Sequence, residues 1–67
     1  MNENEIIEKI LKLYEKYDVD NEYLIKLEKK MIIIGMKGIL EKLDREKKHQ
    51  YTEEDLVLIK RIYGTCC

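Results

Sequence analysis

The sequence of 67 residues contains no proline, no tryptophan and no phenylalanine, and it has only three glycines. Proline and glycine are the residues that most often interrupt helices, so their scarcity leaves few local signals for a break. Apolar residues make up 45% and charged residues 40% of the chain. A composition dominated by Ile, Leu, Lys and Glu is typical of an all-α domain or a helical oligomer, and it is too apolar for a disordered chain. The length allows a single small domain, residues 1–67.

Residues suited to catalysis are also scarce. The chain has no serine and one histidine, His49, and its two cysteines are the adjacent Cys66 and Cys67 at the end. Neighbouring cysteines cannot cross-link distant segments, so we interpret them as free thiols of a reducing compartment. A nucleophile and its base must be held rigidly, which a chain terminus does not provide. We therefore predict a non-catalytic protein with no cofactor and no metal.

Charge and hydropathy argue against two classes of partner. The formal net charge of −1 creates no general attraction to nucleic acid or anionic lipid. The uncharged run Met31–Met36 is much shorter than the roughly 20 residues that span a bilayer. The first five residues include two glutamates and lack the basic start of a secretory signal. We expect a cytoplasmic protein that does not enter membranes.

The first amphipathic segment predicts a helix over residues 5–17, with Asn4 as its N-cap. Charged side chains fall on the opposite side and include Glu and Lys pairs four residues apart. At about 100° per residue, the apolar side chains share one broad stripe. These are Ile6, Ile7, Ile10, Leu11, Leu13, Tyr14 and Tyr17.

The second segment predicts a long helix over residues 20–48, capped by Asp20 after the short polar connection at 18–21. The short connection favours an antiparallel hairpin with the first helix. In projection, apolar residues cover two neighbouring faces of this helix, and only a narrow strip is charged. A helix that is apolar on most sides must be buried on most sides. We therefore expect a second copy of the chain to cover what the other helices leave exposed, in a homodimer or larger bundle.

Gly35 and Gly38 interrupt the most apolar part of this segment, and each costs about 1 kcal/mol relative to Ala inside a helix. One interpretation is a smooth patch on a continuous or kinked helix, where another helix comes close. The other is a break, with residues 30–34 as a short strand followed by a turn and a helix from about Met36. Three consecutive isoleucines favour a strand, but no other segment offers a partner strand.

One face of the predicted long helix is the candidate interaction surface. We predict that it binds another protein, and that the chain is a small regulator, adaptor or inhibitor acting as a homo-oligomer. Its members are Leu24, Leu27, Met31, Ile34, Gly35 and Gly38.

The third segment predicts a helix over residues 52–63. Thr52 and Asp55 have the spacing of a capping box, with Asp55 in the place of the usual Glu or Gln. Gly64 follows the last apolar residue, as a C′ glycine does. We expect residues 64–67 to form a flexible tail.

Two further hypotheses concern polar residues near this third helix. Glu46 and His49 have the i, i+3 spacing of ligands in di-iron bundles, although lysines surround them and a solvated helix end is the simpler interpretation. Residues 45–61 also allow a DNA-binding helix-turn-helix as the alternative function, with phosphate contacts from Arg45, Lys47, Lys48, Lys60 and Arg61. Recognition helices read bases with their N-terminal residues, and here these are Glu53, Glu54 and Asp55. Nucleic acid is therefore an unfavoured partner.

Overall fold

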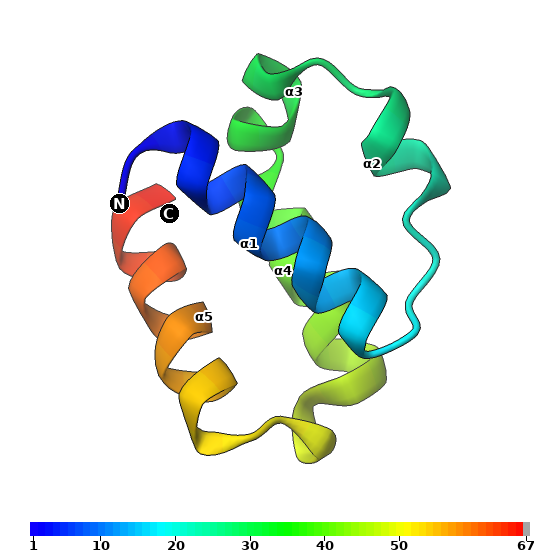
Figure 1. Ribbon diagram of the computed structural model, residues 1–67, viewed down its shortest axis with the longest axis vertical. Helices are drawn as coiled ribbons and strands as arrows, with labels where there is room; N and C mark the ends of the chain where they lie inside the picture. Colours follow the sequence, from blue (N-terminus) through cyan, green and yellow to red (C-terminus); the bar gives the residue numbers. More distant parts are fainter. Residues whose placement is uncertain (67) are drawn as a thin grey trace.

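The structure is a computed structural model that describes residues 1–66. Figure 1 shows that α1 and α4 cross at the centre, that α5 lies along one side of them, and that α2 and α3 run over the opposite end. The prediction of an all-α fold is confirmed, since residues 1–66 contain no strand. The elements are α1 (Glu3–Lys16), α2 (Glu22–Lys26), α3 (Lys29–Ile34), α4 (Met36–Lys47), the 3-10 turn η1 (Lys48–Gln50) and α5 (Glu53–Cys66).

The core lies between α1, α4 and α5, where the apolar stripe of each helix meets the others. α1 contributes five buried residues, more than any other helix, whereas α2 and α3 contribute one each, Leu24 and Ile32. Burial of these side chains is the main force that holds the helices together. The buried apolar residues are Ile6, Ile7, Ile10, Leu13, Tyr14, Tyr17, Val19, Leu24, Ile32, Met36, Ile39, Leu40, Leu43, Ile59 and Ile62.

Helix α1 begins two residues earlier than the predicted 5–17 and ends one residue earlier. Its N-cap is Asn2 and not Asn4, because the Asn2 side chain accepts a hydrogen bond of 2.9 Å from the Glu5 N–H. The earlier start places Glu3 and Glu5 in the first turn, where the helix dipole favours carboxylates. The helix ends as Asp18 adopts a φ of 56°, a conformation that Asp tolerates better than most residues.

The prediction of one helix over residues 20–48 is wrong, because the structure divides this segment into α2, α3 and α4. The first break is at Leu27 and Glu28, which have extended ψ angles of 148° and 152°. The second is at Gly35, which has φ −88° and ψ 10°. Each break changes the direction of the chain. Apolar residues from both faces of the predicted continuous helix can therefore be buried in the same core.

Gly35 combines parts of both interpretations of the glycine region. The helix from Met36 is present, but residues 30–34 are helical and not a strand. The Gly35 N–H donates to the Met31 carbonyl at 2.9 Å, and the Ile39 N–H donates to the Gly35 carbonyl at 3.0 Å. Helical hydrogen bonds therefore run up to Gly35 and resume from it, so that the break is a bend between two helices.

The chain buries its own core to the extent expected of an ordinary monomer. Its accessible surface is 4723 Å². A folded monomer of 8.1 kDa is expected to expose about 4,500 Å². The broken central segment buries half of its large apolar side chains within one chain. These are Leu24, Ile32, Met36, Ile39, Leu40 and Leu43. Among residues 1–66, no helix combines the length and apolar character needed to cross a bilayer.

Helix α5 begins as predicted and ends later. Thr52 is its N-cap, since the Asp55 N–H donates to Thr52 Oγ1 at 3.2 Å. The helix then continues through Gly64 to Cys66, so Gly64 is not the C′ residue and residues 64–66 are not a tail. Cys67, the last residue of the predicted tail, lies outside the described residues.

Replacing Gly38 by Ala tests whether this glycine serves the fold. A Cβ at Gly38 meets nothing within 4 Å, so Gly38→Ala should raise the free energy of unfolding by about 1 kcal/mol through helix propensity alone. The matched variant Gly35→Ala should gain less, because its Cβ would lie 3.3 Å from the Met31 carbonyl oxygen at the bend. Urea denaturation at low protein concentration measures both. A loss of stability in Gly38→Ala would contradict the open space around that position.

Candidate functional site

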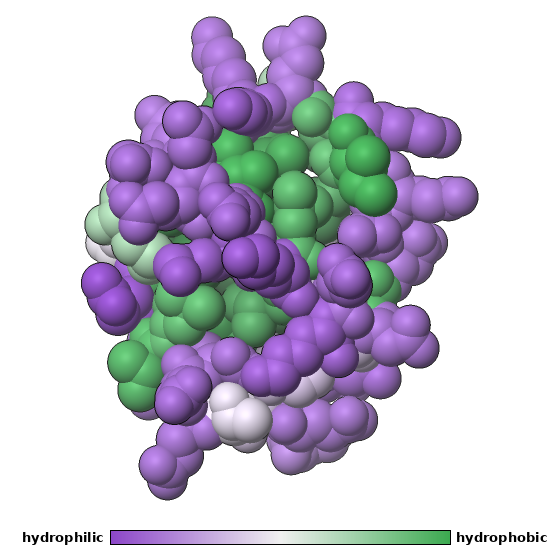
Figure 2. Space-filling model, viewed as in Figure 1, coloured by the Kyte–Doolittle hydropathy of each residue, from purple (hydrophilic) through white to green (hydrophobic). Residues whose placement is uncertain are grey.

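The most prominent surface feature is a group of exposed apolar side chains on α2 and α3. In the space-filling view, hydrophobic atoms gather over these two helices (Figure 2). Apolar side chains that cluster inside a polar rim are typical of protein-binding sites, whereas scattered ones are ordinary. We define the α2–α3 surface by its members and their exposed fractions: Tyr23 (41%), Ile25 (67%), Leu27 (37%), Met31 (51%) and Ile34 (69%).

These side chains are exposed because α2 and α3 are too short to bury more. α2 has five residues and buries Leu24; α3 has six and buries Ile32. Neither helix has a side-chain hydrogen bond at its N-cap, and the first turn of α3 carries Lys29, whose charge opposes the helix dipole. Helices of this length are unstable on their own. Packing against α1 and α4 therefore holds the segment, and it should be the least stable part of the fold.

The predicted interaction surface is only partly exposed. Leu24 has 0% exposure and belongs to the core, so it cannot take part in an outer surface. Leu27, Met31 and Ile34 are exposed, as are Gly35 and Gly38.

Ile25 and Tyr23 are the exposed apolar residues that the sequence prediction missed. The projection of a continuous helix placed Tyr23 on the face of the predicted surface, although not among its members, and Ile25 on the neighbouring face. The signal that could have identified these two residues is the uncharged run from Tyr23 to Ile25, close to the turn-forming Asn21.

Two lysines attach this segment to the remainder of the chain. The Lys42 ammonium group lies 4.9 Å from the centre of the Tyr23 ring and 3.5 Å from the Asp20 carbonyl oxygen. The Lys29 ammonium group donates to Asn4 Oδ1 at 3.1 Å. Asp20, the predicted cap of this segment, does accept from the Glu22 N–H at 3.0 Å, although Asn21 is the residue that precedes the helix.

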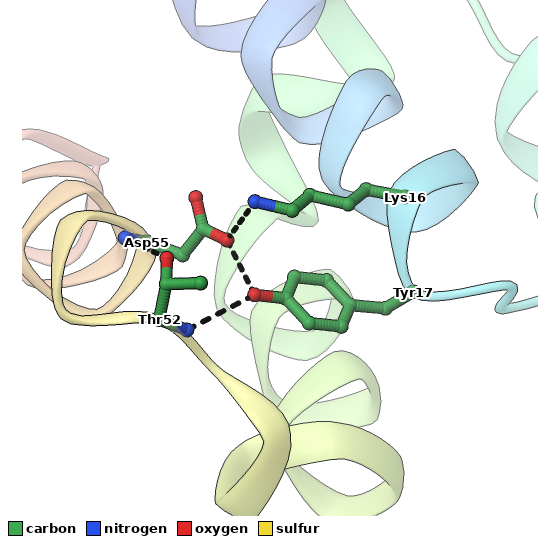
Figure 3. Close-up of polar contacts among 4 residues, drawn as sticks. All are labelled: Lys16, Tyr17, Thr52 and Asp55. Carbon is green, nitrogen blue, oxygen red and sulfur yellow. Dashed lines mark hydrogen bonds and ion pairs between the residues drawn. The ribbon is translucent and has the colours of Figure 1, made fainter.

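A second feature is a polar network that joins α1 to the start of α5 (Figure 3). The Asp55 side chain is buried, and its Oδ2 accepts from the Lys16 ammonium group at 2.7 Å and from the Tyr17 hydroxyl. The same hydroxyl accepts from the Thr52 N–H at 3.2 Å. In a capping box, the side chain three residues after the N-cap, here Asp55, would accept directly from the N-cap N–H, here that of Thr52. In this protein the Tyr17 hydroxyl lies between the Thr52 N–H and the Asp55 carboxylate and bonds to both.

The Asp55 carboxylate stays charged because of its donors. Burial alone would raise the pKa of Asp55. Hydrogen bonds with Lys16, Tyr17 and Thr52 lower it by a larger amount, so that the pKa lies below its ordinary value. The same contact raises the pKa of Lys16. Lys16, the Tyr17 hydroxyl, the Thr52 N–H and Asp55 Oδ2 are thus linked by hydrogen bonds, which cross-link α1 to the start of α5.

The other tyrosines also serve as links inside the fold. The Tyr14 hydroxyl donates to the Ile39 carbonyl at 2.5 Å and joins α1 to α4. The Asp44 carboxylate accepts from Tyr51 at 2.6 Å and from Tyr63 at 3.1 Å, which ties the end of α4 to α5. Burial raises the pKa of Tyr51 above its ordinary range, and the bond to Asp44 adds to that shift. Most tyrosines are thus committed to internal contacts.

Metal-binding and catalytic hypotheses gain no geometric support. Glu46 lies in α4 and His49 in the 3-10 turn η1, so they do not share one regular helix, and both are exposed. No group of three or more His, Cys, Asp or Glu side chains in residues 1–66 is arranged to hold a metal ion. Cys66 is half-buried against the core. One hollow of about 350 Å³ is open to solvent and is lined by Glu41, Asp44, Arg45 and Lys48.

The geometry of α5 bears on the DNA-binding alternative. Its N-terminal turn, which would have to enter a groove, carries the exposed Glu53 and Glu54. The third acidic residue, Asp55, faces α1 and is bound to Lys16. The element that would read bases is therefore negatively charged and partly occupied by an internal contact.

Comparisons with models of known protein families, with curated proteins and with solved structures give no match to this chain.

Replacing Asp55 by Asn tests the network between α1 and α5. The variant loses a charged acceptor, so the free energy of unfolding should fall by about 1–3 kcal/mol at neutral pH. Because the folded pKa of Asp55 is lowered, its contribution is present above the unfolded value of about 3.9 and disappears as pH falls through the folded value. Urea denaturation from neutral to acidic pH should therefore show the difference from wild type shrinking in acid. The exposed neighbour variant Glu54→Gln is the control, and a pH-independent difference for Asp55→Asn would argue against the network.

Binding to random duplex DNA tests the alternative function. We expect no salt-dependent mobility shift, because the first turn of α5 would repel phosphate. A shift at low salt that weakens as salt rises, and that Lys60→Glu with Arg61→Glu reduces, would contradict this expectation and support DNA binding.

Proposed function

We propose that this protein is a small non-catalytic interaction module, a regulator, adaptor or inhibitor, that acts by binding protein through the α2–α3 surface. The observation that carries the proposal is the exposure of five large apolar side chains within residues 23–34. Most of the other large apolar side chains of the protein are buried or partly buried. We also propose that it works in the cytoplasm and as a homo-oligomer.

Ile25 and Ile34 are the expected anchors of the interaction. Each exposes about two-thirds of its surface, and burying that fraction on binding would contribute about 1–2 kcal/mol per residue. Interfaces commonly depend on a few such anchors surrounded by polar contacts. The exposed charges around them, including Lys26, Glu28 and Lys30, supply a polar rim.

The weak local stability of α2 and α3 supports the same proposal. A segment held mainly by packing can adjust its side chains and helix ends to a partner at small cost. The rigid part of the molecule, formed by α1, α4 and α5, would then serve as the scaffold that presents it. Binding residues are often found on mobile segments that a rigid scaffold positions.

The test is co-purification from the native host with tagged wild-type protein and two variants. Ile25→Glu with Ile34→Glu places two charges on the α2–α3 surface, and it should remove the bound proteins while leaving helicity unchanged, because both side chains are exposed. Val57→Glu is the matched control, since Val57 is 58% exposed on α5 and outside the surface. It should retain the partners. If the double variant keeps them, or if both variants lose them equally, the proposed surface is wrong.

A further inference from the structure

We infer that the partner of the α2–α3 surface is a second copy of this chain, and that two folded monomers associate reversibly about a two-fold axis. This inference rests on the proposed function, because it names the occupant of the same surface. It goes further in stating that each chain is folded before it pairs. Three observations carry it: the signs of the charges around the surface, the size of the exposed segment, and the open space at Gly38.

The rim of the surface carries both signs of charge. In a two-fold symmetric dimer the same patch meets itself, so a rim of one sign would face like charge on the partner and be repelled. A rim that mixes both signs can place opposite charges together in the two copies. The exposed charged residues of the segment are Glu22, Lys26, Glu28, Lys29 and Lys30, two acidic and three basic.

The size of the exposed segment suits a weak, reversible dimer. A standard interface takes about 20–30 residues from each partner, and weaker complexes use smaller interfaces. Ten of the 13 residues in 22–34 are exposed. The segment therefore offers a smaller interface than the standard one, and Ile25, Met31 and Ile34 are its most exposed apolar members.

Gly38 gives a partner a close approach beside this segment. It lies in the first turn of α4, four residues after Ile34, and it is exposed. Apart from Gly38, its two neighbours and the nearby backbone of its own helix, none of residues 1–66 has an atom within 4 Å of the place that a Cβ would take. Since glycine is unfavourable inside a helix, internal packing does not explain its presence. A partner helix lying against Ile34 could use this smooth position.

The dimer should be reversible and not required for folding. An obligate dimer has an interface that resembles a core cut in half, and its monomers expose much more surface than a compact protein does. Here the monomer has the surface of an ordinary folded chain of its size. Dilution should therefore separate folded monomers and should not unfold them.

Analytical ultracentrifugation over a range of concentrations tests the inference with the purified full chain. The wild-type mass should rise from that of a monomer, 8.1 kDa, to twice that value, with helicity by circular dichroism unchanged. Ile34→Glu should weaken association at least tenfold, and Val57→Glu should associate as wild type does. A wild-type monomer at all concentrations, a trimer or larger assembly, or equal loss in both variants would overturn it.

A charge variant separates self-association from binding to a different protein. Lys26→Glu with Lys30→Glu leaves one basic and four acidic rim residues, so two copies should repel at low salt and regain affinity as salt screens the repulsion. Unchanged association at low salt would contradict the role of the rim. If wild type is monomeric while Ile25→Glu with Ile34→Glu still removes a host protein in co-purification, the second copy and the homo-oligomer are excluded, and the proposed binding of another protein through this surface survives. If neither assay depends on the surface, both fail.

Discussion

The fold depends on one constraint, which is that residues 22–43 contain more apolar side chains than one helix can bury against two neighbours. The extended residues Leu27 and Glu28 and the bend at Gly35 relieve it by dividing the segment into three helices. Leu24, which lies on one face of the predicted continuous helix, then reaches the same core as Ile32 and Met36, which lie on the other. What remains outside is a limited apolar surface. The proposed interaction is a consequence of this incomplete burial.

The network around Asp55 has a complementary role, because it fixes α5 to α1 with polar contacts. A carboxylate is costly to bury unless charged or polar donors compensate for its lost hydration. Lys16 and the Tyr17 hydroxyl provide that compensation, and the hydroxyl also satisfies the Thr52 N–H. The rigid scaffold of α1, α4 and α5 therefore has both apolar and polar cross-links, whereas α2 and α3 are attached mainly by single buried residues.

Local sequence signals predicted the helical class, the three amphipathic stripes and the Thr52 cap, because each depends on residues within one or two turns. They did not predict the break at Leu27 and Glu28, since both residue types form helices well and only packing against distant α1 favours the interruption. Gly35 carried a visible signal, but the signal did not distinguish a contact patch from a bend. The exposure of Ile25 and the burial of Leu24 followed from the first break, so Leu24 cannot belong to the candidate surface, and the role of the other members stays a prediction.

Amide hydrogen exchange at Glu28, Lys29 and Lys30 tests the central claim most directly. The first N–H groups of a helix have no partner within it, and α3 begins at Lys29 after an extended Glu28. In a continuous helix the same three amides would bond to the carbonyls of the preceding turn. At a concentration where the protein is monomeric, the divided structure predicts that these amides exchange far faster than those of Leu40 and Leu43 in α4. Slow exchange of all three, at the rate of the α4 amides, would show a continuous helix and contradict the account.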